Sequence, residues 1–113
     1  MSTAQILRVA GIVPEGRWTT YGEIAEVVYG HRRGGAQTVG NVIHSGGDIG
    51  SAHRTLRAGG KIAPLWQGVG GGPEECRRRL EKEGSWDGRR DRARADRFID
   101  ARGLRRQLEA AGP

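Results

Sequence analysis

Cys76 is the one residue of this sequence that offers a thiolate, the strongest nucleophile among protein side chains at neutral pH. Arg77, Arg78 and Arg79 follow it directly and favour the charged form of the thiol. The nearest histidine in the sequence, which could take the proton, is His53. We interpret Cys76 as a cysteine of a helix rather than a catalytic one. A lone cysteine also excludes a disulfide within the chain.

A run from Gly68 to Gly72 contains four glycines, and glycine-rich loops can cradle phosphate groups. A nucleotide-binding loop continues with lysine and then serine or threonine, whereas this run continues with Pro73. The run therefore predicts a flexible loop. We expect neither a cofactor nor a metal ion to be bound.

Arginine dominates the charge of the chain. Of the 19 basic residues among 113, only Lys61 and Lys82 are lysines, and the formal net charge is +6. Guanidinium groups bind phosphate in a bidentate way, so this excess favours a nucleic-acid partner. A bias in the base composition of the gene is the plainer alternative. The arginines of residues 77–82 lie among glutamates and are interpreted as a solvated helical face.

Helical spacing of apolar residues predicts three helices in the first half of the chain. Ser2 and Gln5 have the spacing of a capping box, and the helix that they begin ends near residues 14–16. Thr20 and Glu23 form a second capping box, in which Glu23 is expected to reach back to Thr20. A third helix is expected from about Gly35 to His44, closed by Gly46-Gly47. The last two helices and the basic turn between them predict a helix-turn-helix.

The second half of the chain predicts a hairpin and a further helix. Gly59-Gly60 lies between two short extended runs, so residues 54–66 are expected to form the hairpin, or wing, of a winged helix. Pro73 and Gly84 are suited to the two ends of a helix. Residues 87–113 are rich in arginine and aspartate, and a few apolar residues are expected to pin one or two helices to the core: Phe98, Ile99, Leu104 and Leu108.

The predicted fold class is mainly α with a small β-hairpin: a winged helix-turn-helix domain over residues 1–86 and a basic C-terminal helical extension over residues 87–113. The chain is long enough for one domain with a modest core. Its apolar runs are too short for a membrane span, and it starts without the pattern of a signal peptide. We expect a cytoplasmic protein, associated with the nucleoid when bound, and a monomer.

Four motifs stand in order along residues 3–85. They are Pro14-Glu15-Gly16-Arg17 continuing through Thr20-Tyr21-Gly22-Glu23-Ile24-Ala25; Ala36-Gln37-Thr38-Val39-Gly40; Ser51-Ala52-His53-Arg54; and Leu80-Glu81-Lys82-Glu83-Gly84. Together they resemble the DNA-binding domain of the 6-O-alkylguanine-DNA alkyltransferases. That family has Pro-Cys-His-Arg at its active site, and Ala52 stands here at the position of the cysteine that accepts the alkyl group. The combination is similar to the alkyltransferase-like proteins, which recognise damaged guanine without repairing it themselves.

The resemblance implies roles for the residues around Ala52. His53 and Glu83 match the relay that activates the family's cysteine. With alanine beside them they have nothing to activate, so we expect them to remain as a structural hydrogen-bonded link to the helix after Pro73. Arg54 is expected to hold the third helix or the DNA backbone. His31 and His44 show no partner pattern and are interpreted as surface or groove-facing residues.

The resemblance also implies how DNA is bound. The family enters the minor groove and flips the damaged base out of the stack. Tyr21 matches the tyrosine that crowds the phosphate beside the lesion. Gln37 stands where the family has an arginine that fills the gap left by the base, and Arg33 is a candidate substitute four residues earlier. The full set of expected DNA- and lesion-binding residues is Thr20, Tyr21, Arg33, Gln37, Gly40, Asn41, Ala52, Arg54 and Trp66.

Three functions follow as hypotheses. The first is a lesion sensor without enzymatic activity, which binds double-stranded DNA with alkylated guanine and presents it to the damage-recognition proteins of nucleotide excision repair. The second is a winged-helix transcriptional regulator or general DNA-binding protein without lesion specificity. The third is a true alkyl-transfer enzyme, against which Ala52 argues. Because a methyl group is smaller than the family's thiol, the first hypothesis includes tolerance of a range of alkyl groups.

Overall fold

A computed structural model of the chain describes residues 3–45, 50–66 and 71–112. The cap expected at Ser2, the glycines at 46 and 47 and part of the glycine-rich run lie outside the described residues. No helix in the described ranges is long and apolar enough to cross a membrane.

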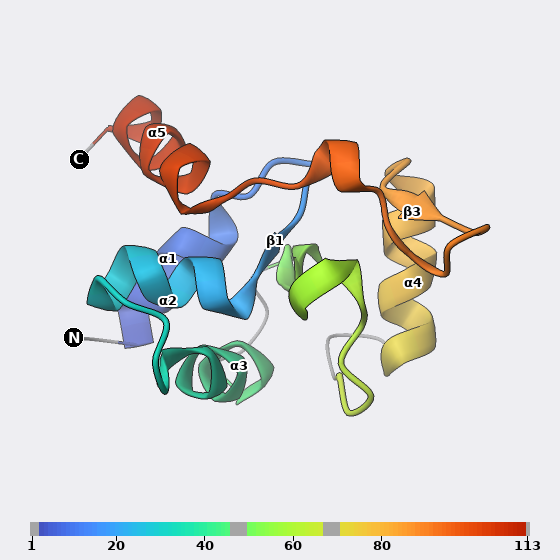
Figure 1. The fold of residues 1–113 in the computed structure, drawn as a ribbon, viewed down its shortest axis with the longest axis horizontal. Helices are drawn as coiled ribbons and strands as arrows, with labels where there is room; N and C mark the ends of the chain where they lie inside the picture. The colour runs from blue at the N-terminus through green and yellow to red at the C-terminus, as the bar shows by residue number, and fades with distance from the viewer. Residues whose placement is uncertain (1–2, 46–49, 67–70, 113) are drawn as a thin grey trace.

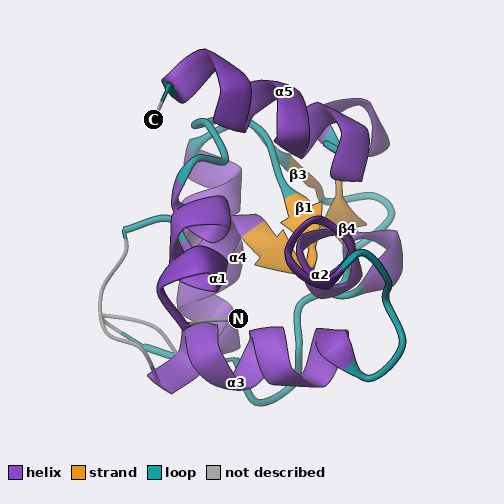
Figure 2. Cartoon of the chain, turned by 90° about the vertical axis from the view of Figure 1, so that its left-hand side faces the viewer, coloured by secondary structure: helices purple, strands orange, loops and turns teal. Residues whose placement is uncertain are grey.

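The described chain is mainly helical, as the sequence predicts, and Figures 1 and 2 show α2 lying between α3 on one side and α5 on the other. The five helices are α1 (Thr3–Gly11), α2 (Tyr21–Tyr29), α3 (Gly35–Ser45), α4 (Pro73–Lys82) and α5 (Ala101–Ala111). Buried apolar side chains from all five meet in one core. Its largest fully buried members are Trp66, Ile6, Ile24, Leu56, Leu80 and Leu104.

Two pairs of short strands complete the fold. Thr19–Thr20 (β1) pairs in parallel with Thr55–Leu56 (β2), and Trp86–Asp87 (β3) pairs antiparallel with Arg92–Ala93 (β4). Short 3-10 helices lie between these elements: Ala52–Arg54, Ala58–Gly60 and Ala95–Arg97.

The start of α2 follows one half of the predicted capping box. Thr20 is extended, and its hydroxyl accepts a hydrogen bond from the backbone N–H of Glu23 at 3.2 Å. The other half is wrong, because Glu23 does not reach back to Thr20. Its buried carboxylate accepts the N–H of Ala101 at 2.8 Å and pairs with Arg32. Glu23 therefore joins α2 to the start of α5 and to the turn before α3.

Helices α2 and α3 approach each other closely at Gly35. A Cβ atom there would lie 2.8 Å from the Cβ of Ala25 and 3.0 Å from Cδ2 of Tyr29. Separations this short force one helix away from the other, so only glycine fits without a shift.

We expect Gly35→Ala to lower the free energy of unfolding by about 1–3 kcal/mol, because an added methyl group overpacks the contact between α2 and α3. Chemical denaturation followed by circular dichroism measures this change. Gly11→Ala is the matched control, since a Cβ atom there meets nothing within 4 Å. An equal stability of the Gly35→Ala and Gly11→Ala variants would contradict the close approach.

The hairpin expected over residues 54–66 is reduced to a turn. Thr55 and Leu56 pair with β1 instead of folding back on the following residues. One antiparallel bridge joins Arg57 to Lys61 around Gly59 and Gly60, both of which have positive φ. The prediction of a full hairpin is wrong, because β2 pairs with β1 and one bridge joins the two sides of the turn.

The described segment after residue 86 contains one α-helix, as expected, and also a strand pair that the sequence did not predict. Residues 86–93 form the β3–β4 pair, and α5 is the one α-helix described in this part of the chain. The segment before α5 packs beside β1: the Trp18 indole N–H donates to the Arg94 carbonyl at 2.7 Å, and the Thr19 hydroxyl donates to the Ile99 carbonyl at 2.8 Å. The rings of Trp18 and Phe98 are 4.9 Å apart. The division of the chain at residue 86 stays a prediction.

Candidate nucleic-acid interface

Helix α3 presents a polar face to solvent. Gln37 and Asn41 are exposed and four residues apart, while Val39 and Ile43 are buried against the core. Both polar side chains therefore lie on the same open face of the helix. Arg33 does not share this face in helical register, because it precedes the helix and is separated from it by Gly34 at a φ of 72°. Helical geometry therefore does not place Arg33 where it could take the role of Gln37.

Tyr21 begins α2 and lies largely buried against α3. Its hydroxyl is 2.9 Å from Nε2 of His44, and its ring lies against Gly40. Burial raises the pKa of Tyr21 above its usual range, so the side chain is a neutral phenol. His44 thus has a partner that the sequence did not indicate, and its interpretation as a surface or groove-facing residue stays a prediction. The sequence gives no signal for this contact, since the two residues are 23 positions apart.

Trp66 is fully buried and faces the same histidine. The ring centroids of His44 and Trp66 are 6.1 Å apart, in an edge-to-face arrangement. The indole N–H of Trp66 finds no hydrogen-bond partner within the described residues. Three aromatic rings thus connect the start of α2, the end of α3 and the segment before α4. Trp66 supports this cluster from within the core.

Glu83, at the C-terminal end of α4, is the centre of a hydrogen-bonded network. Its Oε2 lies 2.7 Å from Nε2 of His53 and 2.6 Å from Nη2 of Arg54, and its Oε1 accepts the N–H of Gly16 at 3.3 Å. Arg54 also donates to the carbonyl of Val13 at 3.0 Å. The link expected between His53 and Glu83 is therefore present. Arg54 does not hold α3, because its guanidinium contacts Glu83 and Val13 instead, while a contact with the DNA backbone stays a prediction.

The network fixes the protonation of its members. Burial acts to raise the pKa of Glu83, but hydrogen bonds from Arg54, His53 and Gly16 lower it to about 2. Burial lowers the pKa of His53, although Glu83 acts against this. We infer that a neutral His53 donates from Nε2 to the Glu83 carboxylate. Its Nδ1 is then an unprotonated acceptor, buried and without a partner among the described atoms.

The side chains around this network offer no activated nucleophile. Ala52 begins the 3-10 helix before β2 and contributes a buried methyl group. Cys76 is fully buried, its thiol lies 3.7 Å from the backbone carbonyl of His53, and burial raises its pKa to about 12. The following arginines do not overcome this burial, so the thiol stays protonated at neutral pH.

We expect acid to destabilise the fold through Glu83 and His53 together. Glu83 ionises near 4.5 in the unfolded chain and near pH 2 in the folded one, so its contribution is complete above about pH 4.5 and is lost as the pH falls toward 2. Neutral His53 acts in the same direction below its ordinary pKa of 6.5. Urea denaturation between about pH 7 and 2 should show a loss of about 3 kcal/mol from Glu83 alone. If the free energy of unfolding of the Glu83→Gln variant fell as steeply with pH as that of the unaltered protein, Glu83 would not be the group responsible.

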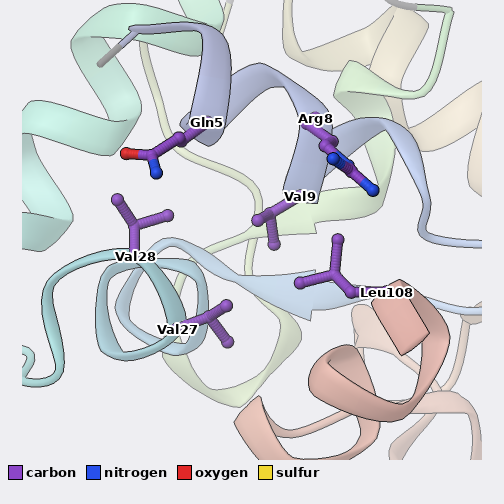
Figure 3. Close-up of a pocket in the computed structure, with 6 residues that line it drawn as sticks. All are labelled: Gln5, Arg8, Val9, Val27, Val28 and Leu108. Atoms are coloured by element: carbon purple, nitrogen blue, oxygen red, sulfur yellow. The ribbon is translucent and has the colours of Figure 1, made fainter. Parts of the chain in front are cut away.

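A separate pocket of about 320 Å³ lies between α1, α2 and α5. Figure 3 shows apolar side chains from all three helices around it. The pocket is lined by Gln5, Arg8, Val9, Val27, Val28 and Leu108. None of these belongs to the expected DNA-binding set. In the described part of the chain, no group of three or more His, Cys, Asp or Glu side chains could hold a metal ion.

Residues 2–85 match the family described as 6-O-methylguanine DNA methyltransferase, DNA binding domain. The fold is also similar to the crystal structure of S. pombe Atl1 in complex with damaged DNA containing O6-carboxymethylguanine, with a TM-score of 0.57 and 26% sequence identity over 74% of this chain and 76% of that chain. Among curated proteins, no sequence gives a significant match.

Proposed function

Because the chain belongs to the family of the 6-O-methylguanine DNA methyltransferase DNA-binding domain, we propose that it is an alkyltransferase-like protein that binds 6-O-alkylguanine in DNA and does not remove the alkyl group. The observation that carries this proposal is Ala52 beside the intact His53–Glu83–Arg54 network. By the resemblance, Ala52 stands at the family's acceptor position, so its methyl group gives the neighbouring network nothing to activate. The likeness to Atl1 bound to damaged DNA supports the lesion-binding part.

In the proposed complex, α2 and α3 are the helix-turn-helix and the turn at Gly59-Gly60 is its wing. The exposed face of α3 enters the minor groove, where Gln37 fills the space left by the flipped base and Asn41 lies one turn further along. Flipping costs a few kcal/mol and is easiest for a weakened pair, which an alkylated guanine forms. Tyr21, seated at the start of α2, crowds the adjacent phosphate.

Without transfer, the complex would persist and mark the lesion for nucleotide excision repair proteins. Helix α5 lies on the side of α2 opposite to α3, which supports access to the protein while DNA is bound (Figures 1 and 2). We therefore place the contact with a repair partner, rather than a further DNA contact, in the segment after residue 86. A cytoplasmic, monomeric protein acting on the nucleoid completes the proposal.

Two assays on the same preparation test the proposal. Fluorescence titration of matched duplexes with and without 6-O-methylguanine should show tighter binding to the modified duplex, and a labelled-methyl assay should leave no label on the protein. Contact with about five phosphates predicts that log affinity falls with log salt at a slope of about −4 to −5. Equal affinity for the two duplexes would instead indicate a general DNA-binding protein. Transfer of the label would indicate an enzyme.

His44→Leu is expected to weaken binding of the modified duplex about fivefold, because the Tyr21 hydroxyl loses a hydrogen bond worth about 1 kcal/mol. His44→Gln, which can restore the bond, should recover part of this affinity. His31→Leu is the matched control: His31 is exposed and stacks on Tyr29, away from Tyr21. Binding unaffected by His44→Leu would show that the Tyr21 hydroxyl needs no support from α3.

A further inference from the structure

Arg57 emerges from the strand pair beside Tyr21. Thr20 of β1 and Leu56 of β2 are Cα partners in the parallel register, so the next residues of the two strands, Tyr21 and Arg57, leave the pair from adjacent positions. The pKa of Tyr21 reflects this neighbour: burial raises it, Cys76 raises it further, and the charge of Arg57 acts in the opposite direction. A cation therefore stands close to the phenol at the start of α2.

A tight turn holds Lys61 next to Arg57. The N–H of Arg57 donates to the carbonyl of Lys61 at 2.8 Å, and the two residues form an antiparallel bridge. The turn itself is seated against β4, since a Cβ atom on Gly60 would lie 3.0–3.1 Å from atoms of Ala93. Two cationic residues are thus fixed on one rigid turn rather than carried on a flexible loop.

Neither cation is neutralised by the rest of the described chain. Both side chains are exposed, and neither makes an ion pair or a side-chain hydrogen bond there. The arginines of α4 differ, because Arg77, Arg78 and Arg79 each pair with a glutamate of the same helix. Two like charges held close together repel each other, and an anion between them removes that cost. A phosphodiester fits, because guanidinium binds phosphate in a bidentate way and ammonium binds it as a point charge.

We propose that Arg57 and Lys61 together form a phosphate-binding site for the DNA backbone next to the nucleotide that Tyr21 contacts. This inference rests on the proposed function, and neither residue belongs to the expected set of DNA-binding residues. The site contributes affinity for any duplex, because a backbone phosphate carries no information about the base. Recognition of the lesion stays with the residues of α2, α3 and the Ala52 segment.

The test is a salt titration of DNA affinity with the full chain on duplexes with and without 6-O-methylguanine. Arg57→Ala and Lys61→Ala should each make the slope of log affinity against log salt shallower by about 0.9, and the double variant by about 1.8. Both duplexes should lose affinity by the same factor, so the preference for the lesion is unchanged. Arg57→Lys should restore most of the slope because it keeps the charge.

Arg102→Ala/Arg106→Ala is the matched control, since it removes two exposed charges of α5 that pair with none of the described residues and lie on the other side of α2. Its slope should equal that of the unaltered protein. A slope that stays the same in the Arg57/Lys61 double variant, or that falls equally in the α5 control, overturns the site. A different result would be that the unaltered protein binds both duplexes equally while the salt slope still depends on Arg57 and Lys61. That result would refute the proposed function and support the phosphate site.

Discussion

Replacing Glu83 with alanine is expected to lower the free energy of unfolding by about 3–5 kcal/mol, the largest effect of any single substitution considered for this protein. The carboxylate accepts hydrogen bonds from His53, Arg54 and the backbone of Gly16, and its side chain is 10% exposed. Without it, the Arg54 guanidinium stays largely buried with only the Val13 carbonyl as a partner. Chemical denaturation at neutral pH measures the loss.

Two further variants distinguish the contribution of this network to stability from that of helix propensity. Glu81→Ala lies on the same helix, is exposed, and should change stability by less than about 0.5 kcal/mol. Glu83→Gln keeps the shape but removes the charge, so its stability should lie between that of Glu83→Ala and that of the unaltered protein. A Glu83→Ala variant as stable as Glu81→Ala would show that the network contributes nothing to the fold.

Glu23→Ala is expected to cost about 3 kcal/mol, because it leaves the Ala101 N–H without its acceptor and Arg32 without its buried partner. The loss should appear first at α5, which begins at that N–H. Hydrogen exchange of the α5 amides would detect local opening, and denaturation would give the total.

Glu26→Ala is the matched control for Glu23. Glu26 lies one turn along the same helix and binds the same Arg32. Its side chain is 33% exposed, however, and within the described residues its carboxylate accepts no backbone N–H of α5. A half-exposed ion pair contributes less than about 1 kcal/mol. Similar losses from both variants would mean that the charge on Arg32 matters and the link to α5 does not.

Local signals in the sequence predicted the helices well. The cap at Thr20, the helix from Gly35 and the proline at the start of α4 all follow from rules that depend on a few neighbouring residues. The family assignment is also confirmed, since its motifs are written in contiguous residues. The hairpin prediction failed, because Thr55 and Leu56 had two possible partners. They pair with β1 rather than with the residues across Gly59-Gly60.

The interactions that the sequence could not reveal join residues far apart in the chain. Glu23 satisfies a backbone group 78 residues away, although its spacing from Thr20 favours a local capping bond. His44 meets Tyr21 only because α2 and α3 approach closely, and Arg57 lies beside Tyr21 only because two strands pair in parallel. Each of these contacts depends on tertiary packing, which overrides a local preference of a few tenths of a kcal/mol to about 1 kcal/mol.

Residues 94–101 pack against Trp18 and Thr19, so the stretch that matches the family, residues 2–85, gains contacts from residues that follow it. A polypeptide ending at Ser85 would expose the Trp18 indole to water and take the Ala101 N–H away from the Glu23 carboxylate, which would keep its ion pair with Arg32. Trp18 directly precedes β1, and Glu23 lies in the first turn of α2, so both are close in the chain to Tyr21. We therefore expect shortening of the arginine-rich end to destabilise the domain that matches the DNA-binding family, although the removed residues lie outside that domain.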